Sequence, residues 1–322
     1  MRLLIYHIAL LLAFFSFNAN AQKPDFIVDA SGKGDFSTVQ AAFDAVPHFR
    51  KKETVIFIKN GVYKEKLILP TSKTNVTLIG ESVEKTIITN DDYASKPNVF
   101  GEEMGTTGST TFYVFGDNFH AQNITFENSA GPVGQAVAVR VDGDQVIFEN
   151  CRFLGFQDTL YPHGKESRQY YYNCYIEGTT DFIFGWSTAV FENCEIHSKK
   201  GGNYITAAST TEGTEFGFVF IACRFTAEKG VVDIYLGRPW RPFAKTVIIN
   251  SELGSHIHAA GWHNWNKPEA ESTSFYAEYN NTGAGADTSH RSSWSHQLKD
   301  DQEYQLKNIF NDWLPKIEKQ EE

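Results

Sequence analysis

The sequence predicts an all-β fold, a right-handed parallel β-helix, in which successive coils of the chain stack on one another. The first observation is a recurring short segment, an aromatic or aliphatic residue followed by polar residues and often by Cys, at 126–128, 148–151, 172–174, 191–194, 221–223 and 249–250. The Asn positions of the first four copies are 22, 23 and 20 residues apart, and the later steps lengthen to 29 and 28. A period of about 20–30 residues is typical of solenoids. The second observation is that such short coils leave no room for crossover helices, which disfavours a doubly wound α/β sheet.

The first 21 residues have the pattern of a secretory signal peptide. Arg2 supplies a basic start, residues 3–15 are mostly apolar, and Ala19-Asn20-Ala21 fits a cleavage site between small residues. A membrane anchor is the alternative, although the apolar run is short for a bilayer. We therefore expect residues 1–21 to direct export to the periplasm, the cell surface or the medium. Residues 22–322 should form a single β-helix domain.

Elements near both ends of the chain should close the solenoid. Ser37 and Gln40 have the spacing of a helix-capping box, and the apolar positions 39, 42, 43 and 46 share one face up to Pro47, which predicts an N-terminal capping helix. Strand-like runs follow at 54–59, 66–69, 76–79, 86–89 and 111–115. Near the other end, apolar residues at helical spacing before Pro315 predict a C-terminal amphipathic helix: Leu306, Ile309, Phe310, Trp313 and Leu314.

The charge of the chain limits its partners. The formal net charge is −10, and it becomes −11 without Arg2, the one charged residue of the signal. An acidic surface disfavours nucleic acid and anionic membranes as partners. No second apolar run is long enough to span a membrane. A capped solenoid of this size is expected to be a monomer.

Four Cys residues occupy one place in the repeat, at 151, 174, 194 and 223. They form no Cys-x-x-Cys pair, so no zinc site is expected, and nothing in the sequence calls for another metal or a cofactor. Equal positions on neighbouring coils would stack about 4.8 Å apart, and export permits oxidation. We expect a disulfide between Cys174 and Cys194, which would pin the coil containing Asp181. The alternative is a column of buried free thiols.

The repeat also sets which polar residues become neighbours. Gln135 and Gln157 each lie seven residues after an Asn of the repeat, and Asp158 and Asp181 each lie eight residues after one. Because equal offsets mean vertical stacking in a β-helix, Gln135 should lie beside Gln157, and Asp158 beside Asp181. The same count in the following coil reaches Lys200 and Gly201.

This arrangement predicts acyl chemistry without a metal. Two carboxylates about 5 Å apart cannot both ionise easily, so one should keep its proton near neutral pH. The pair then supplies a general acid and a nucleophile from the same residue type. The amides of Gln135 and Gln157 offer N–H donors, as an oxyanion hole requires.

Several segments of the mature chain resemble the signature segments of pectin methylesterases, in the same order. They are Gly-Val-Tyr-Lys-Glu at 61–65, Gly-Pro-Val-Gly-Gln-Ala-Val-Ala-Val-Arg at 131–140, Gln-Asp-Thr-Leu-Tyr at 157–161, Gly-Thr-Thr-Asp-Phe-Ile-Phe-Gly at 178–185, Tyr-Leu-Gly-Arg-Pro-Trp at 235–240 and Gly-Trp at 261–262. Each piece alone is a weak signal. Together they cover essentially the whole mature chain.

The resemblance implies a role for each matching residue. Asp181 would be the nucleophile that attacks the C6 methyl ester of homogalacturonan, and Gln157, helped by Gln135, would stabilise the oxyanion. Asp158 would protonate the departing methanol and then act as a base on water. Arg238 would hold Asp181 ionised. Three aromatic residues would bind sugar rings, with core packing the alternative, strongest for Phe184: Trp240, Tyr161 and Phe184.

Two other readings of the sequence stay open. A polysaccharide-cleaving β-helix enzyme is one, because carboxylates about 5–5.5 Å apart are also the geometry of a retaining glycosidase. The paired Gln residues favour an oxyanion instead, and a calcium-dependent lyase would need an acidic cluster that the sequence does not offer. A non-catalytic sugar-binding β-helix is the other, although it would have no reason to align Asp158 with Asp181.

Overall fold

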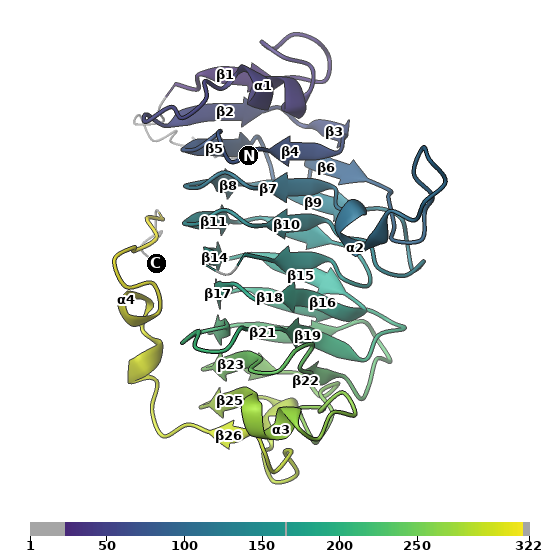
Figure 1. Cartoon of the computed structure of the whole chain (residues 1–322), viewed down its shortest axis with the longest axis vertical. Helices are drawn as coiled ribbons and strands as arrows, with labels where there is room; N and C mark the ends of the chain where they lie inside the picture. Colours follow the sequence, from purple (N-terminus) through teal and green to yellow (C-terminus); the bar gives the residue numbers. More distant parts are fainter. Residues whose placement is uncertain (1–22, 165, 318–322) are drawn as a thin grey trace, which may run out of the picture.

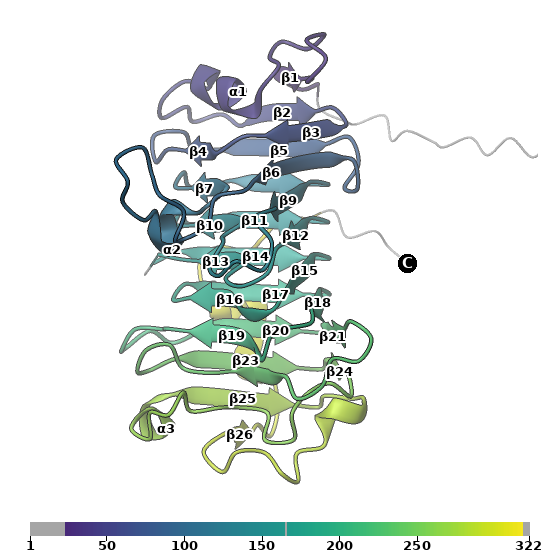
Figure 2. The same ribbon diagram turned by 90° about the vertical axis from the view of Figure 1, so that its right-hand side faces the viewer.

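The computed structural model describes residues 23–164 and 166–317, so the predicted signal peptide lies outside the described residues. Within them the chain forms an elongated stack of coils, seen from two sides in Figure 1 and Figure 2. Each strand pairs in parallel with the equivalent strand of the next coil, which builds three long sheets. The predicted parallel β-helix is confirmed. No helix in the described part of the chain is long and apolar enough to cross a bilayer.

The three sheets run along the whole stack. Sheet A contains β1 (Phe26–Val28), β2 (Thr54–Ile58), β5 (Val76–Gly80), β8 (His120–Gln122), β11 (Val146–Glu149), β14 (Arg168–Tyr172), β17 (Thr188–Glu192), β20 (Phe218–Ile221), β23 (Lys245–Ile249), β25 (Phe275–Tyr279) and β26 (His296–Gln297). Sheet B contains β3 (Gly61–Lys64), β6 (Thr86–Asn90), β9 (Thr125–Asn128), β12 (Arg152–Leu154), β15 (Tyr175–Gly178), β18 (Glu195–Ser198), β21 (Arg224–Ala227) and β24 (Glu252–Leu253). Sheet C contains β4 (Leu67–Leu69), β7 (Phe112–Val114), β10 (Val139–Val141), β13 (Leu160–Pro162), β16 (Thr180–Gly185), β19 (Tyr204–Ala208) and β22 (Tyr235–Gly237).

Aromatic side chains fill the interior of the stack in columns. Phe148, Tyr171, Phe191 and Phe220 occupy one position of successive coils of sheet A, and all four are fully buried. Their ring centroids are 5.2, 4.7 and 4.6 Å apart, with interplanar angles of 12° or less. Burial of such large apolar rings is the main stabilising term for a solenoid, because each coil has a core only where it meets its neighbours.

A short helix covers the N-terminal end of the stack, as expected. α1 (Val39–Ala45) buries Val39, Ala42 and Phe43, and the ring of Phe43 stacks on that of Phe112. The capping residue differs from the prediction, because Thr38 rather than Ser37 accepts the hydrogen bond from the Ala41 N–H. The carboxylate of Glu65 accepts the first two helical N–H groups, so a neighbouring coil completes the cap.

One copy of the predicted repeat is wrong. The residue that stacks below Asn150 is Asn123, because Phe148 pairs with Ala121 and the following residue pairs with Gln122. The step between these coils is therefore 27 residues, and residues 126–128 belong to sheet B instead. Asn123, Asn150, Asn173, Asn193 and Asn250 form the true column, all with φ between 51° and 57°. Asn tolerates this left-handed conformation better than most residues, which explains the recurrence.

Asn128, the residue mistaken for a repeat member, has a different role. Its side chain is buried and its amide group donates to the carbonyl oxygens of Asp92, Ser109 and Val137. These three acceptors lie on the long connection between β6 and β7 and on the chain entering β10. Asn128 therefore fixes a loop that leaves the solenoid, whereas the Asn column fixes a turn between two sheets.

The predicted disulfide between Cys174 and Cys194 is not present. All four cysteines are free and buried, and they stack as the alternative expectation described. Parallel in-register strands keep stacked Cβ atoms about 4.8 Å apart, beyond the range of about 3.5–4.5 Å that a disulfide requires. Each thiol lies instead within hydrogen-bond distance of a carbonyl oxygen of the preceding coil, as Cys174 does with Phe148 at 3.4 Å.

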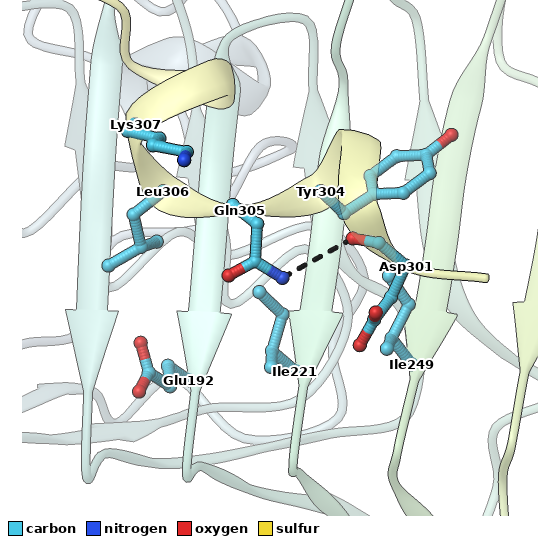
Figure 3. Close-up of a pocket in the computed structure, with 8 residues that line it drawn as sticks. All are labelled: Glu192, Ile221, Ile249, Asp301, Tyr304, Gln305, Leu306 and Lys307. Atoms are coloured by element: carbon cyan, nitrogen blue, oxygen red, sulfur yellow. Dashed lines mark hydrogen bonds between the residues drawn. The ribbon is translucent and has the colours of Figure 1, made fainter.

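The C-terminal segment follows sheet A, but the predicted helix is much shorter. Only α4 (Leu306–Ile309) is α-helical, preceded by the 3-10 turn η2 (Gln302–Tyr304), because Asn311 adopts a φ of 53° and ends the helix. Figure 1 shows the segment lying beside sheet A, and Figure 3 shows Leu306 and Gln305 facing the strands that carry Glu192 and Ile221. A hollow of about 410 Å³ lies between them. Other short helices are α2 (Gly105–Gly108), α3 (Ala270–Thr273) and η1 (Ala284–Ala286).

Candidate active site

The predicted polar residues meet where the chain passes from sheet B into sheet C. Gln135 and Gln157 form a parallel bridge on adjacent coils, which confirms their predicted pairing. Leu160 pairs with Ile183, and the same step of 23 residues sets Asp158 against Asp181. The prediction for the next coil is wrong, since Tyr204, not Lys200, pairs with Thr180. The chain between β18 and β19 is longer than the repeat allows.

Both aspartates occupy irregular backbone. Their φ values are 64° for Asp158 and 51° for Asp181, in the left-handed region that Asp adopts more readily than most residues. The pairing of β16 with β19 also shifts between Thr180 and Ile183. Such a β-bulge redirects a side chain, and bulges are common beside active sites. Local strain is therefore concentrated at the two carboxylates.

Arg238 holds one of these carboxylates in a fixed orientation. Its Nε and Nη2 donate to the two carboxylate oxygens of Asp181, at 2.9 and 2.7 Å. The preceding residue, Gly237, permits this approach, because a Cβ there would lie 2.0 Å from Oγ1 of Thr206. A bidentate arginine pair of this kind favours the ionised carboxylate and restricts its rotation.

Two aromatic rings enclose the guanidinium group of Arg238. Its Cζ lies 3.8 Å from the ring centroid of Tyr204 and 3.6 Å from that of Trp265. The ring of Tyr204 stacks in turn on Tyr235, with centroids 5.4 Å apart. The aromatic faces attract the cation and leave its edge free to bind Asp181. We call Tyr204 and Trp265 the arginine clamp.

The two carboxylates have different electrostatic environments. Burial raises the pKa of Asp158 well above its usual value, and the negative charge of Asp181 raises this pKa further. Burial also raises the pKa of Asp181, but its hydrogen bonds to Arg238 and the charge of that arginine oppose the rise. Asp158 is only 6% exposed and its carboxyl makes no hydrogen bond to another described residue. Of the two, Asp158 therefore keeps its proton to higher pH.

The amide groups of Gln135 and Gln157 are available to a ligand. Neither side chain donates or accepts a hydrogen bond within residues 23–164 and 166–317, and neither is fully buried. Both line the same cleft as the two aspartates. Free amide donors beside a buried nucleophile can stabilise a negative oxygen in a transition state.

The cleft has a volume of about 480 Å³ and aromatic walls. Tyr161 and Phe184 stack with centroids 4.0 Å apart, but they are 5% and 4% exposed, so they present only ring edges. Trp240 lines the cleft beside them and is more accessible. The structure thus brings all three predicted aromatic residues to the site and shows that two of them also pack in the core.

The sequence did not point to several residues that line the cleft. They are Met104, Gly105, Thr106, Thr107, Ala207 and Trp265. The first four belong to the long connection around α2, which carries no repeat signal. Trp265 follows the Gly-Trp segment at 261–262 and could have been suspected from it. Tyr204, which holds Arg238, has no motif at all.

Two features of the site restrict its chemistry. Among the described residues no group of three or more His, Cys, Asp or Glu side chains could hold a metal ion. The nucleophile, the acid and the anion-stabilising donors come from the protein's own side chains, on three adjacent coils. A parallel β-helix with this division of labour between its carboxylates belongs to the class of carbohydrate esterases.

Comparison with known proteins identifies the family. The family model described as Pectinesterase matches residues 25–310, and the chain belongs to this family. It is 44% identical to Pectinesterase 31 of Arabidopsis thaliana over 283 residues, covering 85% of this chain and 88% of that protein. It spans about half the length of several other curated relatives.

Solved structures agree with the family. A pectin methylesterase from carrot superposes with a TM-score of 0.83 at 37% identity, covering 90% of this chain and 94% of that one. A pectin methylesterase in complex with a hexasaccharide superposes with a TM-score of 0.80 at 32% identity, covering 92% and 100%. The predicted family, fold and enzyme class, a carboxylic ester hydrolase, are thus confirmed.

Proposed function

We propose that this member of the pectinesterase family hydrolyses the C6 methyl esters of homogalacturonan with Asp181 as nucleophile and Asp158 as acid and base. One observation carries the assignment. Arg238 binds both oxygens of Asp181, whereas the neighbouring Asp158 is buried without a partner. The first carboxyl is favoured as the anion and the second as the acid, so the two roles are divided before substrate arrives.

In the first step, a carboxylate oxygen of Asp181 attacks the ester carbonyl carbon. The carbonyl oxygen becomes negative and accepts hydrogen bonds from the amide of Gln157, with Gln135 beside it. Asp158 gives its proton to the methoxy oxygen, the bond from carbon to that oxygen breaks, and methanol leaves. The galacturonyl group is now joined to Asp181 as an anhydride.

In the second step, water replaces methanol. The ionised Asp158 takes a proton from the water as its oxygen attacks the carbonyl carbon, and the same amides stabilise the second oxyanion. The bond to Asp181 breaks and releases a free galacturonate. Asp158 has regained its proton, and Asp181 returns to its pairing with Arg238. The cycle needs no oxidant and no metal.

The surroundings of the cleft support a sugar polymer as the substrate. Trp240, Tyr161 and Phe184 line it and offer apolar surface to sugar rings. The apolar segment at residues 3–15 and the small residues at 19–21 support export of the enzyme to where such a polymer occurs.

The test is methanol release from highly methylated pectin, with the length of the polymer measured in the same samples. We expect methanol without chain shortening and without added metal. Asp181→Ala should lower turnover by about 10⁴-fold or more, since a missing nucleophile leaves only binding and electrostatic terms. Shorter chains or unsaturated ends without methanol would refute the esterase proposal, and full activity of Asp181→Ala in a folded protein would refute the nucleophile.

A further inference from the structure

Two adjacent apolar side chains stand out from the surface near the cleft. Val99 is 93% exposed and Phe100 is 85% exposed, the highest values among the large hydrophobic residues of the described chain. They occupy the tip of a hairpin-like loop closed by an antiparallel bridge between Pro97 and Glu103. Both views show this loop projecting from the solenoid beside α2 (Figure 1, Figure 2). We call residues 97–103 the apolar tip.

Hydrogen bonds hold the apolar tip in one conformation. The side-chain oxygen of Asn98 accepts from the backbone N–H groups of Phe100 and Glu102, at 2.8 and 3.1 Å. Below the tip, the N–H of Met104 donates to the carbonyl oxygen of Lys96. The ammonium group of that lysine in turn bridges Asp91 and Asp92. A loop fixed in this way presents its apolar side chains without the entropy cost of ordering them on binding.

The apolar tip is continuous with one wall of the cleft. Met104 and the three residues that follow it line the cleft, and only three residues separate Met104 from Phe100. The other side of the loop is tied to the site as well, because the N–H of Ala94 donates to the carbonyl oxygen of Gln135. Two residues before that glutamine, Val133 is also 47% exposed. Exposed apolar surface therefore gathers at the Gln135 end of the cleft.

We propose that the apolar tip is a distal binding surface for a methyl-esterified stretch of the polymer that extends beyond the cleft. This inference rests on the proposed function. The ring of Phe100 and the side chain of Val99 offer a surface that matches the C–H faces of sugar rings and uncharged methyl esters. Stretches that carry free carboxylates fit less well, because the exposed side chains of Glu102 and Glu103 flank the apolar pair.

Charge and size favour the polymer over other occupants. The acidic flanks and the net charge of −10 oppose an anionic bilayer. Two side chains are also too small for a stable protein partner, which needs about 800 Å² on each side. A polymer already bound in the cleft adds a short apolar contact at little further entropic cost, because its binding at the tip is then intramolecular.

The experiment compares the double variant Val99→Ser/Phe100→Ser with wild type on two substrates. One is long, highly methylated pectin, and the other is a methylated trisaccharide that occupies only the cleft. We expect the KM for long pectin to rise about five-fold, with kcat unchanged, and both constants for the trisaccharide to stay as in wild type. The rise should be smaller on long pectin that has been partly de-esterified.

A matched control is Phe49→Ser, which removes another exposed aromatic ring, 73% exposed, beyond α1 at the N-terminal end of the stack. It should leave both substrates unaffected. Unchanged KM for long pectin in the double variant would overturn the inference, and so would an equal loss on both substrates or a loss of binding to anionic vesicles in place of pectin. Methanol release from the trisaccharide by wild type tests the proposed function separately, since its absence would refute that function whatever the tip does.

Discussion

Two corners of the solenoid use the same backbone conformation for opposite purposes. At the corner between sheets A and B, Asn150 and Asn173 have φ values of 51°, and at the corner between sheets B and C, Asp158 and Asp181 have values of 64° and 51°. The asparagine amides bond to one another from coil to coil, as Asn173 does to Asn150. The aspartates cannot do the same, because neighbouring carboxylates repel when both are ionised.

The difference shows how a repetitive fold acquires an active site. Stacking identical amides satisfies donors and acceptors on every coil, whereas stacking identical carboxylates leaves one of them buried, protonated and without a partner. Arg238 relieves the strain at Asp181 only, which makes the two carboxylates chemically different. The asparagine corner is therefore expected to contribute stability, and the aspartate corner to reduce it in exchange for activity.

The largest expected effect comes from loosening the arginine clamp. Tyr204→Leu removes one aromatic face from Arg238, so the guanidinium group should lose orientation and stabilise the anion of Asp181 less well. The pKa of Asp181 then rises, and more of this carboxyl is protonated on the acid side. We expect the acid limb of kcat/KM to move up by roughly one pH unit, about a ten-fold loss at pH values below that limb.

Tyr204→Phe is the matched control for this change, because it keeps the ring and removes only the hydroxyl. Its pH profile should follow wild type. A loss of activity in Tyr204→Leu that is equal at all pH values would contradict the positioning role, since general damage to the fold does not move the acid limb. Tyr204 is suited to this test because it acts on Arg238 and is not among the residues that line the cleft.

Much of the fold could be predicted because its cause is local and repeated. A left-handed Asn at each turn and a Cys beside it recur in sequence as they recur in space, which revealed the stack. The same simplicity misled the count at 126–128, where an aromatic-Glu-Asn segment ends a strand of another sheet. The correct partner, Asn123, lacks the aromatic residue two positions before it and carries Ala121 there. Pattern alone could not choose between the two.

The site was predicted correctly for a reason that was partly accidental. Gln135 lies 22 residues before Gln157, but the coil that carries it is five residues longer at the Asn corner, and the chain loses the difference before β10. The loop around α2 and the arginine clamp could not be predicted, because they join residues from distant coils. Tyr204, Arg238 and Trp265 share no spacing, and only packing brings them together.

A second prediction concerns the stability cost of the aspartate corner. Asp158→Asn should abolish efficient turnover but raise the free energy of unfolding by about 1–2 kcal/mol at pH 7–8. The sign follows from the raised pKa. The folded state holds the proton to higher pH than the unfolded chain does, so the penalty is absent below about pH 4, where both states are protonated. It grows with pH until the folded carboxyl has ionised, and is fully present above that point.

Denaturant unfolding of wild type and Asp158→Asn from pH 4 to pH 8 measures this cost. The two proteins should converge at the acid end and separate as the pH rises. Asp181→Asn is the contrasting variant, because it leaves the guanidinium group of Arg238 without its carboxylate and should gain little or lose stability. A gain in Asp158→Asn that is the same at every pH would mean that the charge of Asp158 is not its source.

The smallest expected effect lies at the one interruption in the asparagine column. Ala222 stands between Asn193 and Asn250 with a φ of 52°, a conformation that costs Ala about 1–2 kcal/mol and that Asn tolerates better. Ala222→Asn should therefore raise the free energy of unfolding by about 0.5–1 kcal/mol, by relieving this strain and by restoring amide contacts to the coils on either side. Ala222→Gly relieves the strain without adding an amide, so Asn should exceed Gly if the side-chain column itself stabilises the stack. Equal stability of the two variants in thermal and denaturant unfolding would mean that the column reflects only the backbone conformation, and the contrast between the two corners would then lie entirely in the aspartates.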